Sequence, residues 1–434
     1  MLIEPKILKG FRDFLPEKAL QRKNIIRILE KTFTSFGFQT IDTPVLEYKE
    51  VLLGKGGGET DKQVYAFKDN GKRDVALRFD LTVPFARFMA AHINELSLPF
   101  KRYHIDKVWR GENTQKGRYR EFIQCDFDIV GLDNASADFE ILQLMHSSFK
   151  AMGVNNITIK IAHRGIFNNF LTKIKAADKA VEIMRTVDKI SKIGKDNVFK
   201  ILNELTNSDS ANKILEYIEP ENKFLETLRK ITLMSGGESE ASNRLYEVYN
   251  FMTETGIEDL FSLDPSITRG LDYYTGIVYE TFLNDLPTLG SVCSGGRYNN
   301  LTSVYTKKNL PGVGSSIGLD RLMAGLDELG LLDKKNQSSS VIVINMDKTL
   351  QSYYHKLAAV IRDSGLSCEV YLDTKKIGNQ FSFAEKKGIP YAILCGTEEY
   401  NSNTVTLKNL LTRENFNKIS LNNAISLIKT GKVE

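Results

Sequence analysis

The sequence predicts an α+β domain built on a mainly antiparallel sheet, interrupted by a helical insertion and followed by a small α/β domain. Over residues 1–164 and 261–335, hairpin-linked strand patterns alternate irregularly with helices, which is typical of α+β folds. Residues 165–260 are rich in Lys, Glu, Asn, Leu and Ile at helical spacing and have few strand patterns. Residues 336–434 begin with a polar linker, after which strands and helices alternate regularly.

Composition limits the class of protein. The chain has 434 residues, which at ~100–200 residues per domain suggests several domains. A hydrophobic fraction of 42% argues against a mainly disordered chain. No apolar run reaches ~18 residues and the N-terminus lacks the pattern of a signal peptide, so we expect no membrane partner. The net charge of +4 permits a polyanionic partner without requiring one.

The four cysteines form no CxxC pair, and the five histidines are scattered. Structural zinc and a disulfide framework are therefore not expected, and no direct side-chain motif for a metal is present. Unpaired cysteines fit a reducing compartment, so we expect a cytoplasmic protein.

The first elements can be placed from local patterns. Apolar residues at helical spacing predict a helix over 17–36, and an extended segment follows at 38–48. Two strand patterns then flank Asn70-Gly71, a strong hairpin signal. Thr82 is the expected N-cap of the next helix, and Ser136 that of a later one.

Further strands are expected at 101–110 and 119–130, then at 156–163 and 275–283, and a glycine-rich strand enters a helix over 312–326. In the last domain, four strand patterns alternate with helices. The final helix has Ser420 at its expected N-cap. This alternation predicts a largely parallel sheet.

The segment WRGENTQKGRYREFIQCDFDIVG (109–131) is the most informative for function. Strand side chains alternate, so Ile123, Cys125, Phe127 and Ile129 share a core face. The other face carries cations at one end and acids at the other, and it suits a ligand with a polyphosphate and a cationic group. A merely solvated face would look similar. The polar face and its loop contain Arg110, Glu112, Lys116, Arg118, Arg120, Phe122, Gln124, Asp126 and Asp128.

Four other segments add candidates. In ITRGLDYYTG, Arg269 stands near Tyr273 and Tyr274, although tyrosines on a strand are often core. The glycines of CSGGRYNNL permit close backbone approach, but a simple glycine turn is the usual explanation. GVGSSIGLDRL carries Arg321 one turn into a helix, and ALRFDLTVPFAR contributes Asp80 and Thr82, for which helix capping is the alternative. GKGGGET is not a Walker A motif, because no GK[ST] closes it.

Together these segments resemble class II aminoacyl-tRNA synthetases, and within that class the histidyl-tRNA synthetases. FGFQTIDTPVLE is similar to motif 1, the dimer interface of the class, WRGENTQKGRYREFIQCDFD to motif 2 and GVGSSIGLDR to motif 3. RGLDYYTG and SGGRY resemble two segments peculiar to the histidine enzymes. The resemblance spans nearly the whole chain and implies a C-terminal anticodon-binding domain over 336–434. It also implies a homodimer joined through motif 1.

The resemblance implies the activation of L-histidine with ATP and Mg²⁺, followed by transfer to the 3′ end of histidine tRNA. Arg110 and Arg269 are then the catalytic cations at the α-phosphate. ATP is held by Arg110, Glu112, Arg118 and Arg321. The histidine pocket comprises Asp80, Leu81, Thr82, Arg110, Gln124, Asp128, Arg269, Tyr273, Tyr274 and Tyr298.

Three positions depart from commoner forms of the family: Ile123, Asn299 and Asp80. None removes an implied catalytic group. A non-catalytic, synthetase-like regulatory subunit of ATP phosphoribosyltransferase is the main alternative, although such relatives usually lack the last domain and degrade RGLDYY. A synthetase for proline or threonine and an RNA-binding accessory subunit are the others.

Overall fold

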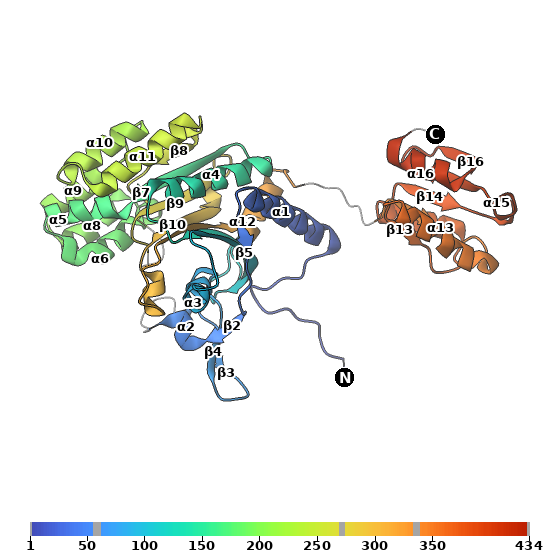
Figure 1. Ribbon diagram of the computed structural model, residues 1–434, viewed down its shortest axis with the longest axis horizontal. Helices are drawn as coiled ribbons and strands as arrows, with labels where there is room; N and C mark the ends of the chain where they lie inside the picture. The colour runs from blue at the N-terminus through green and yellow to red at the C-terminus, as the bar shows by residue number, and fades with distance from the viewer. Residues whose placement is uncertain (1, 55–61, 269–273, 333–338, 432–434) are drawn as a thin grey trace. The chain divides into compact units, whose positions relative to one another are not determined.

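The computed structural model describes residues 2–54, 62–268, 274–332 and 339–431. The chain divides into two compact units, Met1–Leu332 and Asp333–Glu434. Figure 1 shows the first unit as a large sheet with helices against it, and the second as a smaller sheet with its own helices.

Unit 1 is built on an eight-stranded sheet, in which β5 (Phe100–Trp109) and β6 (Glu121–Val130) pair antiparallel along their whole length. Only the pairs β1–β5 and β7–β8 within this sheet, among the described residues, are parallel. The expected mainly antiparallel sheet is therefore confirmed. The other strands, in sheet order, are β1 (Gln39–Thr40) before β5, then β11 (Gly312–Gly318), β10 (Cys293–Tyr298), β9 (Ile277–Leu283), β7 (Ile157–His163) and β8 (Phe261–Leu263) after β6.

A smaller three-stranded sheet precedes it in the chain. Its strands are β2 (Leu46–Tyr48), β4 (Asp74–Leu77) and β3 (Ala66–Lys68), all antiparallel. The turn between β3 and β4 contains Asn70-Gly71, so the predicted hairpin is confirmed. The short helix α2 (Lys49–Leu53) follows β2.

Helices α1 (Pro16–Ser35) and α4 (Ala135–Ala151) contact each other and lie along one face of the large sheet (Figure 1). Phe33 of α1 and Leu142 of α4 are fully buried in the same core as Phe127 of β6. Strand alternation therefore sends the apolar face of β6 into this core and leaves its polar face on the other side of the sheet.

The cap expected for α4 at Ser136 is wrong. Asn134 is the N-cap, because its Oδ1 accepts a hydrogen bond from the Ala137 amide at 2.9 Å. The helix begins two residues earlier than the pattern suggested, so the side chain of Asn134 is the one placed to accept from the free N–H groups of the first turn.

The segment between β7 and β8 is helical, as expected for the insertion, and Figure 1 shows these helices gathered at one end of the sheet. Phe170 stacks on Tyr217 with a centroid separation of 4.4 Å, which gives the segment an aromatic core of its own. Its helices are α5 (Arg164–Lys173), α6 (Ala180–Val187), α7 (Ile190–Ile193), α8 (Lys195–Leu205), α9 (Ser208–Ile218), α10 (Phe224–Met234) and α11 (Glu240–Glu254).

Unit 2 is a five-stranded sheet in the order β13-β12-β14-β15-β16 with flanking helices. The prediction of a largely parallel sheet is wrong: β12 is parallel to β13 and β14, but the pairs β14–β15 and β15–β16 are antiparallel. No helix separates β15 from β16, so the chain returns through a tight turn that only antiparallel strands allow. The cap at Ser420 is confirmed, since its Oγ accepts from the Asn423 amide.

The elements of unit 2 are β12 (Val341–Val343), α13 (Gln351–Asp363), β13 (Cys368–Val370), α14 (Ile377–Lys386), β14 (Tyr391–Leu394), α15 (Thr397–Ser402), β15 (Val405–Asn409), β16 (Asn415–Ile419) and α16 (Leu421–Thr430). No described helix in either unit combines the length and apolarity needed to cross a membrane.

Candidate active site

A cavity of about 230 Å³ lies on the polar face of the large sheet, over β6, β10 and β11. It is closed at one end by the first turn of α12 (Leu319–Glu328) and at another by the loop between β5 and β6. Residues widely separated in the chain meet here. The predicted site residues that line it are Arg110, Glu112, Arg118, Gln124 and Arg321.

Arg110 follows the last residue of β5 and is held in place by its surroundings. Its Nε donates to the Phe79 carbonyl at 3.1 Å. Its guanidinium lies over two rings, 4.3 Å from the centroid of Phe79 and 5.1 Å from that of Phe122. Aromatic faces stabilise a cation while leaving its other N–H groups available to a ligand. Arg110 is thus a preoriented cation in the cavity wall.

The other two cations come from the loop and from α12. A tight turn, in which the Arg118 amide donates to the Gln115 carbonyl at 2.9 Å, sets the direction of Arg118. Arg321 lies in the first turn of α12, and its Nη1 donates to the Ser291 carbonyl at 2.7 Å. Arg120, predicted on the same face, does not line this cavity; its Nε donates to the Glu112 carbonyl at 3.2 Å.

Asp320 anchors this end of the site, and the sequence analysis did not single it out. One of its oxygens accepts from the Ile123 amide at 2.8 Å, which ties α12 to β6. It also pairs with Arg12 at 2.5 Å and with Arg22 at 2.9 Å. Because the carboxylate is 3% exposed and has three donors, it fixes Arg321, its neighbour, relative to the β5–β6 loop.

The acidic end of β6 lies further along the strand. Asp128 accepts from the Tyr298 hydroxyl at 2.5 Å, so two predicted pocket residues are in direct contact. Asp126 lies 3.5 Å from the Thr82 hydroxyl. Gln124 donates to the Ser316 hydroxyl at 2.9 Å from its side-chain nitrogen. The structure therefore brings amide, carboxylate and phenol groups together next to the arginine-lined cavity.

Asp80 and Thr82 lie where α3 (Thr82–His92) begins, but the predicted cap at Thr82 is wrong. Thr82 is the first helical residue, and Asp80 Oδ1 accepts from the Val83 amide at 2.9 Å. Thr82 is thereby left to face Asp126. The Leu81 side chain is 0% exposed, so it belongs to the core rather than to the pocket surface.

A buried arginine that the sequence analysis did not select lies beneath these acids. Arg102 of β5 has its Nη2 2.8 Å from Asp128 and 3.7 Å from Asp126. Burial raises the pKa of Asp126 to about 7, and the charge of Arg102 lowers it. Burial also raises the pKa values of Asp80 and Asp128, again opposed by Arg102. This excess of buried carboxylates favours a cationic ligand.

Glycines in β10 and β11 make room for the acidic end. A Cβ atom at Gly314 would lie 1.9 Å from Asp128 Oδ1, and one at Gly312 would lie 2.3 Å from the Tyr298 ring. The glycine turn considered for CSGGRYNNL is not what the structure has, because Gly295 and Gly296 lie inside β10. These glycines serve close approach between strands and side chains.

Two predicted residues, Arg269 and Tyr273, lie outside the described residues. Tyr274 is described and lies against Gly296, where an added Cβ would come within 3.0 Å of its ring. Its carbonyl accepts from Arg164 Nη1 at 2.9 Å, which joins this segment to the start of the helical insertion.

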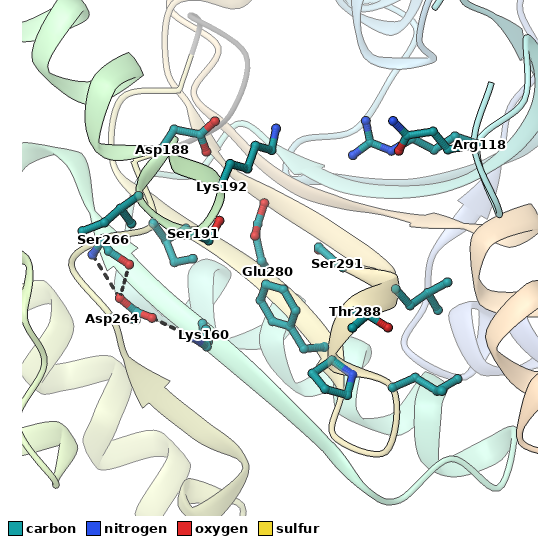
Figure 2. A pocket seen from close by; sticks show the side chains of 18 of the residues that line it. Arg118, Lys160, Asp188, Ser191, Lys192, Asp264, Ser266, Glu280, Thr288 and Ser291 are labelled. Carbon is teal, nitrogen blue, oxygen red and sulfur yellow. Dashed lines mark hydrogen bonds and ion pairs between the residues drawn. The ribbon is translucent and has the colours of Figure 1, made fainter. Parts of the chain in front are cut away.

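A second cavity of about 660 Å³ shares Arg118 and Ser291 with the first. Figure 2 shows Glu280 near its centre, and Lys160 joined through Asp264 to Ser266 at one side. Register places Glu280 opposite Ser294 of β10. The second cavity therefore continues the polar face of the sheet from the first cavity toward the insertion.

Comparisons with known proteins cover both units of the chain. The sequence profile for histidyl-tRNA synthetase matches residues 10–322, and that for an anticodon binding domain matches residues 339–431. The chain is 50% identical to the histidine–tRNA ligase of Treponema denticola over 398 residues, covering 90% of this chain and 89% of that relative.

Two solved structures extend the comparison. Histidyl-tRNA synthetase from a Nostoc species is 30% identical, with a TM-score of 0.87, covering 99% of this chain and 100% of that one. A Bacillus halodurans protein described as an ATP phosphoribosyltransferase regulatory subunit/histidyl-tRNA synthetase is 22% identical, with a TM-score of 0.76, over 92% of this chain and 100% of that one. The second likeness shows the fold alone.

Proposed function

The chain belongs to the histidyl-tRNA synthetase family, and from this premise we infer that the cleft on its large sheet is where histidine is activated and transferred. The protein is a histidine–tRNA ligase: it forms histidyl-adenylate and pyrophosphate from L-histidine and ATP, then loads histidine onto the 3′ end of its tRNA. The observation that carries the assignment to this cleft is the set of three arginines around one cavity, beside a buried tyrosine–carboxylate pair.

We propose that ATP occupies the arginine-lined cavity. Arg110 neutralises the α-phosphate, Arg321 the γ-phosphate, and Arg118 and Glu112 contact the adenine and the distal phosphates. The fixed position of Arg110 over two rings supports its role, because a preoriented cation costs no reorganisation when charge develops.

Glu112 also fits the Mg²⁺ that accompanies ATP. Its oxygens lie 3.9 Å from Arg110 and 3.7 Å from Arg118, so neither arginine is at close hydrogen-bonding distance from this carboxylate. One carboxylate together with phosphate oxygens and water is a common way to hold Mg²⁺. The bound ion supplies further neutralisation of the pyrophosphate leaving group.

We propose that histidine lies at the acidic end. Asp128 and Tyr298 recognise the imidazole of histidine, and Asp80, Thr82 and Gln124 recognise its α-amino group, while Tyr273 and Tyr274 close the pocket. A substrate analogue that lacks the imidazole N–H groups would leave the buried Asp128 carboxylate without the hydrogen bond that the imidazole supplies, which is a strong source of discrimination.

The chemistry then needs positioning more than covalent participation. A carboxylate oxygen of histidine attacks the α-phosphorus, the bond to the bridging oxygen breaks, and pyrophosphate leaves with the electron pair. Arg110 and Arg269 stabilise the charge on the α-phosphate. In the second reaction a terminal ribose hydroxyl attacks the acyl carbon and loses its proton, the bond from that carbon to the phosphate oxygen breaks, and AMP leaves with the electron pair and can take up the proton.

We also propose how the chain meets its partners. Unit 2, which matches the anticodon-binding profile, reads the anticodon of histidine tRNA, and the helical insertion contacts the acceptor stem. Two copies form a homodimer through the motif 1 region, where Val45, Leu46 and Tyr48 are exposed apolar side chains. The four described cysteines are free and buried, in keeping with a cytoplasmic protein.

The deciding experiment is ATP–pyrophosphate exchange with each of the twenty amino acids in turn. We expect exchange with histidine alone, abolished by Arg110→Ala. Exchange with proline or threonine instead would reassign the amino-acid pocket. If a folded protein gives no exchange with any amino acid, the regulatory-subunit alternative replaces this proposal.

A further inference from the structure

Arg102 is fully buried beneath the carboxylates at the acidic end of the cleft. It lies on β5 directly opposite Asp128 in the register with β6. Its Nη2 is 2.8 Å from Asp128 Oδ2 and 3.7 Å from Asp126 Oδ2. The ring of Phe85 covers the guanidinium at 4.3 Å. Because the Arg102 side chain is 0% exposed, water cannot take the place of these carboxylates as its partners.

We propose that Arg102 is a positioning residue for the substrate histidine: a single buried guanidinium fixes Asp128 for the imidazole and holds Asp126 beside Thr82, at the α-amino end. This inference rests on the proposed function of the cleft. It adds Arg102 and Asp126 to the residues that shape the histidine pocket, because Arg102 contacts Asp128 and Asp126 contacts Thr82.

The first support is the way Asp128 is confined. Its Oδ1 accepts from the Tyr298 hydroxyl at 2.5 Å, while its Oδ2 faces Arg102. The backbone at Gly314 lies so close that even an added Cβ would come within 1.9 Å of Oδ1. Contacts from three directions leave the carboxylate one orientation, so Arg102 sets which lone pairs remain for an imidazole N–H.

The second support is the local charge. Three buried carboxylates, Asp80, Asp126 and Asp128, lie near Arg102, whose charge lowers the pKa of each. Without Arg102, mutual repulsion would drive the carboxyls toward their protonated forms. A protonated Asp128 would no longer offer two acceptor oxygens, and a neutral Asp126 would attract an ammonium group less.

The third support is unsatisfied bonding capacity. Within the described part of the chain, Arg102 Nε, Nη1 and Nη2, Asp126 Oδ1 and Asp128 Oδ2 are buried and make no hydrogen bond, so the contact of Nη2 with Asp128 Oδ2 at 2.8 Å is an ion pair alone. Buried polar groups without partners are costly, and they occur where a ligand or water completes the network. Arg102 and Asp126 can therefore form further hydrogen bonds with groups of the bound substrate or with water.

A buried arginine can also be purely structural, and Arg78, directly after β4 of the three-stranded sheet, is a matched example. Arg78 is equally buried, but it pairs with Asp106 at 2.5 Å and donates to the carbonyls of Thr43 and Lys107. None of these partners is a proposed pocket residue. Arg78→Lys therefore controls for the general cost of altering a buried arginine in this fold.

The test measures KM and kcat for histidine and for ATP separately, by ATP–pyrophosphate exchange on the full-length protein. For Arg102→Met we expect KM for histidine to rise about 10- to 100-fold, the loss typical of leaving a buried charge unpaired, with KM for ATP nearly unchanged. Arg102→Lys should have a smaller effect of the same kind, because it keeps the charge but cannot span two carboxylates. Thermal unfolding of each variant checks that the fold persists.

A double variant sharpens the test. Adding Asp126→Asn to Arg102→Met removes one unpaired carboxylate, so we expect it to recover part of the loss in KM for histidine. Equal effects on histidine and ATP, a similar histidine effect from Arg78→Lys, or no change in KM for histidine in Arg102→Lys and Arg102→Met would each overturn the proposal. Absence of histidine-dependent exchange in the unaltered protein would instead overturn the proposed function.

Discussion

Two buried ionisable side chains, His104 and Asp126, lie opposite each other in the β5–β6 register and are shifted in opposite directions. Burial, assisted by the charges of Arg102 and Arg78, lowers the pKa of His104 to about 3. Burial raises the pKa of Asp126 to about 7. His104 is therefore neutral near pH 7, where Asp126 is partly ionised, and both groups link the stability of the protein to pH.

The effect of His104 on stability has a definite sign. Its folded pKa of about 3 lies below the unfolded value of 6.5, so the unfolded chain binds more protons between these values. The stabilising contribution is present above pH 6.5 and is lost as pH falls toward 3. Asp126 acts oppositely: its contribution is present at low pH and is lost as pH rises through about 7.

We predict that His104→Gln flattens the acid side of the stability profile. When the pH is lowered from 7 to 5, the free energy of unfolding of the unaltered protein should decrease by about 2 kcal/mol more than that of the variant, as linkage requires. Denaturant unfolding at several pH values measures this difference, in which the contribution of Asp126 cancels. Parallel profiles would show that His104 is not held neutral.

At this scale, motifs predicted the residues that line the cavity better than those that support it. Residue type and strand alternation select Arg110 and Arg118, whereas Arg321 follows from the resemblance to motif 3, and all three line one cavity. Arg102 and Asp320 were not, because their roles depend on partners that only strand register and helix docking bring near. An arginine on the strand paired with an acidic face is the signal that could have identified Arg102.

At the scale of elements, the sequence of β11 is restricted by a side chain of the neighbouring strand β6. It lies between β6 and β10, and Gly314 stands opposite Asp128 on one side and Gly296 on the other. A side chain at residue 314 would occupy the space of the Asp128 carboxylate. The run GVGSSIG is therefore dictated by packing around a polar group.

We predict that Gly314→Ala lowers the free energy of unfolding by about 1–3 kcal/mol, the usual cost of overpacking. Its Cβ would also lie 2.8 Å from the Phe127 carbonyl, a backbone atom that cannot rotate away. Gly318→Ala, in the same strand, is the control for unfolding, because its nearest contact is 3.8 Å away. Similar losses from both variants would show that helical or strand propensity, rather than the clash with Asp128, is responsible.

Elements with long patterns were predicted well, whereas short ones were not. Helix α1 and strands β5 and β6 follow from sustained periodicity. Strand β8 has three residues, too few to show alternation, and β16 carries polar residues on an edge, so neither was expected. Because the sequence pattern does not reveal β16, it predicts a largely parallel sheet for unit 2.

At the scale of the whole molecule, the two units have separate cores. The core of unit 1 joins the large sheet, α1, α4 and the helical insertion. Unit 2 has its own clusters on both faces of its sheet. The sequence indicated this separation through the polar stretch near residue 336, but it could not indicate how cores form from residues distant in the chain.

Removal of residues 333–434 should separate the two reactions. Because the proposed ATP and histidine sites lie wholly in unit 1, we predict that histidine-dependent exchange persists within a few-fold. Charging of full-length tRNA should fall about 100-fold, since a linked second binding module typically adds 10²–10⁴ in effective affinity. Both rates are measured on the same preparations of the truncated and intact chains.

A minihelix that contains only the acceptor arm provides the matched control. The minihelix has no anticodon for unit 2 to bind, so the intact and truncated chains should charge it at similar rates. Equal charging of full-length tRNA by both chains would remove unit 2 as the anticodon reader. Loss of exchange together with charging would mean that unit 1 needs unit 2 to fold. A selective loss with full-length tRNA is the result expected if catalysis and anticodon reading belong to separate units.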